Sequence, residues 1–129
     1  MIRQLASFVA RISGLALKQD YAGALDEVAR AWTEILDVPR DLVDRLDGPT
    51  LAQLLGDPAK MRVAGELLVE EAKVRTATGD LVHAMQCSRR AFELFLEARA
   101  VDPQPSDDIA ILELARVIPP NEIDARYKS

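Results

Sequence analysis

The amino-acid sequence predicts an all-α protein with two helical hairpins, two short helices between them and a capping helix near the C-terminus. Apolar residues recur at helical spacing along most of the 129 residues. Glycine and proline are few and clustered, which leaves long uninterrupted stretches, and part of the first third of the chain recurs at a shift of 60 residues. We expect one domain over residues 1–120 and a loose tail over residues 121–129.

Residues 1–19 are predicted to form the first helix. They carry Arg3, Arg11 and Lys18 and no acid, so a helix lying on a membrane surface is the alternative. Because arginines interrupt the apolar run, the segment matches neither a secretory signal nor a membrane-spanning helix. We expect Arg3 and Arg11 to stay outside while the apolar face packs on the next helix. The pairs expected to meet are Leu5, Phe8, Val9 and Ile12 with Leu25, Val28 and Trp32.

The repeat aligns residues 1–38 with residues 61–98, and its weakest match sets Val28 on Ser88. Each copy predicts two helices joined by a tight turn. In the second copy Gly79 suits the left-handed residue that ends a helix, and Asp80 suits the N-cap of the next one. The first copy keeps the aspartate and lacks the glycine. The apolar positions of the second helices lie on one face: 21, 24, 25, 28, 31, 32 and 35, and 81, 84, 85, 88, 91, 92 and 95.

The segments KQDYAGALDEVARAW and ATGDLVHAMQCSRRAF resemble the turn and second helix of tetratricopeptide repeats, through Asp20, Tyr21, Ala24 and Ala31 and through Gly79, Asp80, Ala84 and Ala91. The whole chain, with its opening MIRQLASFVARI and the insert DLVDRLDGPTLAQLL, also resembles a family of short bacterial helical proteins with no assigned function. Neither resemblance brings a catalytic residue. The tetratricopeptide resemblance implies a peptide groove lined by the first helices. The candidate residues of this groove are Val9, Ser13, Val69 and Lys73. They occupy the positions of the family's lysine and asparagine clamp for a peptide carboxylate, and because they do not reproduce it, they argue against binding of a carboxylate tail.

Proline and glycine residues mark the expected helix boundaries in the insert between the two copies. We expect a short helix over residues 40–46, and a second that runs to Leu55 with Thr50 and Gln53 as a capping box. Pro58 suits the first turn of the long helix that follows. The insert is expected to cap the first hairpin against the second.

The C-terminal helix is expected to start after Ser106 as its N-cap and to run to about Ile118. It is apolar nearly all the way round, which predicts burial on more than one side. A second stripe, His83, Cys87, Leu94 and Val101, follows the back of the preceding helix. We therefore predict a homodimer, and the alternative is that the C-terminal helix covers this stripe within one chain. The residues expected in self-association are Leu94, Val101, Leu114 and Ile118. Leu114 and Ile118 are expected on the outer side of the C-terminal helix, where they would face water in a monomer.

The sequence contains few of the residues that catalytic and metal sites require. His83 is the only histidine and Cys87 the only cysteine, which is too few side chains for a serine triad or a tetrahedral zinc site. There is no phosphate-binding loop or dinucleotide fingerprint. Glu70-Glu71 and Asp107-Asp108 are interpreted as solvated faces. We expect no enzyme activity, no cofactor and no metal.

The net charge of −5 and an aromatic content of 5% argue against nucleic-acid binding. A single cysteine favours a reducing cytoplasm. The sequence therefore predicts a protein-interaction or adaptor module with an unidentified protein or peptide partner. The alternative is a small-molecule or anion-binding protein, or an enzyme, with Arg75, Arg89 or Arg90 as anion contacts in a helical pocket.

Overall fold

The computed structural model describes residues 1–128 and confirms the all-α prediction, with seven α-helices and no strand in that range. Helix α1 (Ile2–Leu17) is followed by α2 (Tyr21–Leu36), and α5 (Pro58–Ala77) by α6 (Leu81–Val101). The short helices α3 (Arg40–Val43) and α4 (Gly48–Leu55) lie between these pairs. Helix α7 (Pro105–Val117) follows α6, and two 3₁₀ turns, η1 (Pro120–Glu122) and η2 (Ala125–Tyr127), follow α7.

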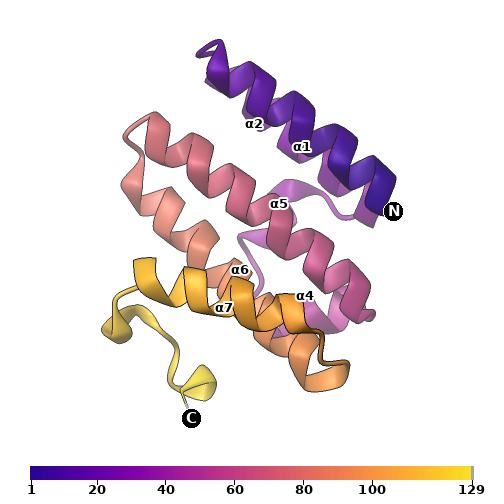
Figure 1. The fold of residues 1–129 in the computed structure, drawn as a ribbon, viewed down its shortest axis with the longest axis vertical. Helices are drawn as coiled ribbons and strands as arrows, with labels where there is room; N and C mark the ends of the chain where they lie inside the picture. The colour runs from indigo at the N-terminus through magenta and orange to yellow at the C-terminus, as the bar shows by residue number, and fades with distance from the viewer. Residues whose placement is uncertain (129) are drawn as a thin grey trace.

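The helices are stacked, with the α1–α2 pair at the top of Figure 1, the α5–α6 pair below it, and α4 and α7 in the lower half. Helix α1 packs on α2 and α5 packs on α6, while α5 also contacts both α1 and α2. Helix α7 packs against α6 and crosses in front of it in Figure 1. The insert reaches across the stack, since α3 contacts α2 and α4 contacts α5 and α6. The α5–α6 pair is therefore the centre of the molecule, with neighbours on several sides.

The turns of the two long pairs have the same geometry. The Asp20 carboxylate accepts a hydrogen bond from the Gly23 amide at 3.0 Å, and the Asp80 carboxylate accepts one from the His83 amide at 3.3 Å. The preceding residue is left-handed in both turns, with φ of 62° at Gln19 and 82° at Gly79. Because a left-handed conformation costs a non-glycine residue roughly 1–2 kcal/mol, the first turn is the more strained of the two.

The N-terminal helix packs into the core. Phe8 and Ile12 are almost fully buried, as are Val28 and Trp32 on α2. Arg3 and Arg11 are exposed as expected. The Arg11 guanidinium lies 4.3 Å from the centroid of the Phe8 ring and covers it from solvent. Within residues 1–128, no helix has the length and apolar character to cross a bilayer.

Two helices begin earlier than expected, and a proline near each start explains why. Asp47, not Thr50, is the N-cap of α4, and its carboxylate accepts a hydrogen bond from the Thr50 amide at 2.8 Å. Gln104, not Ser106, is the N-cap of α7. Proline lacks an amide hydrogen and has a fixed φ, so it is favoured in the first turn of a helix. The prolines at 49 and 105 lie in these first turns.

The expectation that Leu114 and Ile118 face outward is wrong. Leu114 is 7% exposed, Ile118 is 3% exposed and Leu94 is fully buried, all within a single chain. Helix α6 is covered by α5, α4 and α7, which together bury Leu94 and most of its apolar surface. The exposed apolar side chains near the α6–α7 corner are Val101, Ile109 and Leu112.

The segment after α7 lies on the protein surface, although the sequence predicts a loose tail. Glu122 forms an ion pair with Arg89 at 3.2 Å, and the Tyr127 hydroxyl donates to the Glu97 carboxylate at 2.7 Å. Ile123 packs against the core. Ser129, the last residue of the predicted tail, lies outside the described residues.

Candidate binding groove

A groove of about 570 Å³ lies between α5 and α7, with α6 as part of its floor. This size is within the range of small-ligand and side-chain pockets in proteins. Both walls use the spacing i, i+3, i+4 and i+7, which places four residues on one face of a helix. The residues lining the groove are Glu66, Val69, Glu70, Ala72, Lys73 and Thr76 of α5, Ser88 and Phe95 of α6, and Ala110, Glu113, Leu114 and Val117 of α7.

Small side chains create the hollow. Ala72 and Ser88 occupy the positions that Ile12 and Val28 hold in the first pair, at the shift of 60 residues. Ile12 and Val28 are each 1% exposed and fill the first pair. Replacing an isoleucine and a valine with an alanine and a serine removes several heavy atoms at the α5–α6 contact. The weakest match of the repeat therefore lies at the floor of the groove.

Phe95 supplies the aromatic part of the floor, and Gly65 sets the position of its ring. A Cβ atom at Gly65 would lie 2.7 Å from Phe95 Cε2, closer than such atoms approach each other in proteins. The absence of a side chain at Gly65 lets the ring rest against the α5 backbone. Phe95 is 3% exposed, so its ring is held rigidly beneath the opening.

Carboxylates surround the groove. Glu66 and Glu70 come from α5 and Glu113 comes from α7, while Lys73 is the one cation among the lining residues. Lys73 Nζ lies 3.3 Å from Glu70 Oε1, so its charge is already paired. Burial, together with the carboxylates of Glu70 and Glu113, raises the pKa of Glu66, and Lys73 opposes this shift. The groove therefore has an apolar floor and an acidic rim.

A buried ion pair fixes the N-terminal end of α7. Asp107 is fully buried, and its two carboxylate oxygens accept hydrogen bonds from Arg62 at 2.8 and 2.9 Å. The same guanidinium donates to the carbonyl oxygen of Asp102. Hydrogen bonding to Arg62 lowers the pKa of Asp107, so the carboxylate stays ionised despite its burial. The expectation of a solvated face at Asp107 is wrong, although Asp108 is exposed.

Glu71, also expected on a solvated face, is 2% exposed and centres a second buried network. Its carboxylate accepts hydrogen bonds from Arg40 at 2.7 and 3.0 Å and from Arg75 at 3.4 Å. The Cys87 thiol donates to it at 3.4 Å. Burial and the nearby Glu71 charge raise the pKa of Cys87 to about 12.

The residues predicted for a partner groove separate into two places. Val69 and Lys73 line the groove described above. Val9 is half-buried and Ser13 exposed on α1, and neither lines the groove. Glu66, Phe95 and Glu113 also line the groove and were not predicted as groove residues. For Glu113 the reason is that the contribution of α7 depends on how this helix packs against α6.

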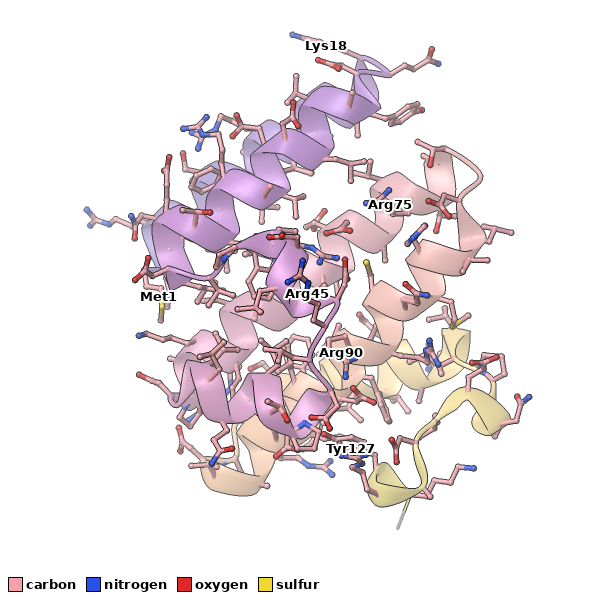
Figure 2. All side chains as sticks on the ribbon, turned by 180° about the vertical axis from the view of Figure 1, so that it is seen from behind. Met1, Lys18, Arg45, Arg75, Arg90 and Tyr127 are labelled. Atoms are coloured by element: carbon pink, nitrogen blue, oxygen red, sulfur yellow. The ribbon has the colours of Figure 1, made fainter. Side chains whose placement is uncertain are left out.

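The arginines considered as anion contacts lie elsewhere. Figure 2 shows Arg75 and Arg90 from the side opposite to the view of Figure 1. Arg89 and Arg90 line a cavity of about 220 Å³ together with Arg40, and Arg75 is not part of its lining. Arg90 pairs with Glu93 at 2.5 Å and Arg89 with Glu122. The Nε atom of Arg89 is buried and has no hydrogen-bond partner.

His83 and Cys87, four residues apart on α6, do not form a common site. His83 is exposed, with Nδ1 at 2.7 Å from Asp80 Oδ2, whereas Cys87 is buried beside Glu71. In the part of the chain that the structure describes, no three His, Cys, Asp or Glu side chains gather as metal ligands would. Comparison of the chain with protein-family models, with curated proteins and with solved structures finds no match.

Proposed function

We propose that this protein is a non-enzymatic interaction module that binds a peptide segment of another protein in the groove between α5 and α7. The observation that carries the proposal is the groove itself, a hollow with an apolar floor that includes Phe95. A concave surface with apolar walls and a few polar groups is the usual form of a recognition site. The equivalent turns at Asp20 and Asp80 support a tetratricopeptide-like arrangement, in which such grooves bind peptides.

The chemistry of the nucleophilic side chains supports a binding role over catalysis. A cysteine acts as a nucleophile through its thiolate, and burial beside Glu71 keeps Cys87 in the thiol form at neutral pH. The imidazole of His83 is at the surface, and its Nδ1 atom is hydrogen-bonded to Asp80, the N-cap residue of α6. The buried free thiol of Cys87 also supports a cytoplasmic location, where cysteines stay reduced.

The second candidate function is the binding of a small anion near Arg89. The buried Nε of Arg89 without a partner favours it, because buried N–H groups are normally hydrogen-bonded. The neighbouring ion pairs disfavour it, since Arg40, Arg89 and Arg90 each already contact a carboxylate. Inorganic phosphate tests this candidate directly: a melting temperature that rises with phosphate concentration at constant ionic strength, and does not rise in Arg89→Leu, would favour it.

Selection from an unbiased displayed peptide library tests the interaction module. The blocked control is the variant Ala72→Ile/Ser88→Val, which restores the side chains found at the same positions of the first pair and should fill the groove. We expect peptides that bind the wild-type protein and lose binding to the filled variant. Peptides that bind both proteins equally, or the absence of any enriched peptide, would contradict the proposal.

A further inference from the structure

The groove differs from the equivalent surface of the first pair in charge as well as in depth. Glu66 and Glu70 stand where the first pair has Ala6 and Ala10. The acidic rim is therefore particular to the second pair, where the helix contact is also hollow. Glu113 brings a third carboxylate from the opposite wall.

Glu70 and Glu113 each repel the Glu66 carboxylate, and Lys73, which opposes this effect, is the one cation in the groove lining. The neighbours Glu70 and Glu113 help to raise the pKa of Glu66, which is the effect of like charges held close together. Lys73, the one lysine or arginine in the lining, lies against Glu70. A partner that brought positive charge to the rim would relieve this repulsion, whereas an acidic partner would increase it.

Resting on the proposed function, we propose that the groove selects a basic amphipathic segment, with apolar side chains that enter over Phe95 and lysines or arginines that meet the glutamates of the rim. The floor, formed by Phe95, Leu114 and the small residues Ala72 and Ser88, receives the apolar side chains. The rim carboxylates favour a positively charged partner and make its association with the groove weaker at higher salt concentration. Acidic segments are excluded by the same charges.

Two synthetic helical peptides with identical leucine spacing test this inference. One carries lysines beside its leucine face and the other carries glutamates at the same positions. Their binding to the full chain is measured by fluorescence anisotropy. We expect the lysine peptide to bind and the glutamate peptide not to bind. The lysine peptide should also lose affinity as the salt concentration rises.

Charge-removing variants test whether the rim carboxylates are responsible for the affinity for the lysine peptide. Glu66→Gln/Glu70→Gln/Glu113→Gln should weaken binding of the lysine peptide about tenfold, since each rim charge contributes a modest amount. The matched control removes the same charge from exposed positions away from the groove, as Asp26→Asn/Asp37→Asn/Asp41→Asn, and should leave the affinity unchanged.

Two blocking variants separate failure of this inference from failure of the proposed function. Ala72→Ile/Ser88→Val fills the floor from α5 and α6, and Ala110→Trp fills it from α7, so one remains informative where the other misfolds. Equal binding of both peptides, abolished by blocking, would overturn the charge selection and leave the groove as a binding site. Binding that survives blocking, equal weakening by the matched control, or no binding of either peptide would overturn the inference.

Discussion

Glu71 is buried and forms ion pairs with two arginines, Arg40 and Arg75. Replacing it with glutamine is therefore expected to lower the stability of the protein strongly. The change removes the negative charge that holds Arg40, whose side chain is only 16% exposed, and weakens the contact with Arg75. Breaking a buried ion pair by removing one partner costs about 3–5 kcal/mol, because the other charge stays buried without compensation. Arg40 keeps Asp44 as an exposed partner, so the cost should be near the lower end, about 3 kcal/mol.

This cost should lower the melting temperature by about 10 °C, given an unfolding entropy of about 2 cal/mol/K per residue for a domain of 129 residues. Thermal and urea unfolding followed by circular dichroism would measure it. Glu70→Gln is the matched control, since the adjacent Glu70 pairs with an exposed lysine and should cost less than about 0.5 kcal/mol.

The double variant Arg40→Met/Glu71→Leu completes the experiment. Apolar side chains of similar size replace both charges, so no buried charge is left unpaired, and its stability should return close to that of the wild-type protein. The reasoning is refuted if Glu71→Gln is as stable as Glu70→Gln, or if the double variant is as unstable as the sum of its two single changes.

Three further predictions concern the turns, the N-terminal helix and α7. Gln19→Gly should stabilise the protein by up to about 1 kcal/mol and Gly79→Gln should destabilise it by about 1 kcal/mol, because both positions are left-handed; urea titration measures both. Phe8→Ala should cost about 3–5 kcal/mol in thermal unfolding, whereas unchanged stability with loss of vesicle binding would identify a membrane helix. Asp107→Asn should cost about 2 kcal/mol at neutral pH. The arginine partner lowers the pKa of Asp107 below 3.8, so its contribution is complete above that pH and is lost as the pH falls through the lowered pKa. The difference from wild type should therefore shrink in acid, and a constant difference from pH 7 to pH 3 would contradict this assignment.

Local patterns in the sequence were sufficient to predict the existence of most of the helices and the turns between them. Asp20 and Asp80 predicted the two turns because an N-cap depends only on the next three residues. Phe8 and Trp32 predicted the core because their spacing is set by the helix period. The starts of α4 and α7 were displaced because the prolines at 49 and 105 favour the first helical turn over the interior.

Local sequence patterns did not predict which charged side chains are buried or which face of the C-terminal helix packs inward. Glu71 and Asp107 are buried because arginines 31 and 45 residues away in sequence reach them, and no local pattern encodes such a contact. Leu114 faces inward because α7 crosses α6 at an angle that follows from packing rather than from its own sequence. The groove depends both on charged side chains from separate helices and on the packing of α7. Of its lining, only Val69 and Lys73 were therefore predicted as groove residues.

The position of the α5–α6 pair in the stack bears on how the molecule opens. In a stacked array, a unit with one neighbour unfolds locally at lower cost than a unit enclosed on both sides. Helices α1 and α2 form the end of the stack and include the strained turn at Gln19. Helices α5 and α6 are enclosed by α1 and α2 on one side and by α7 on another, with α4 against both. Transient opening therefore begins at the N-terminal pair, and the α5 wall and the α6 floor of the groove keep their shape while it happens.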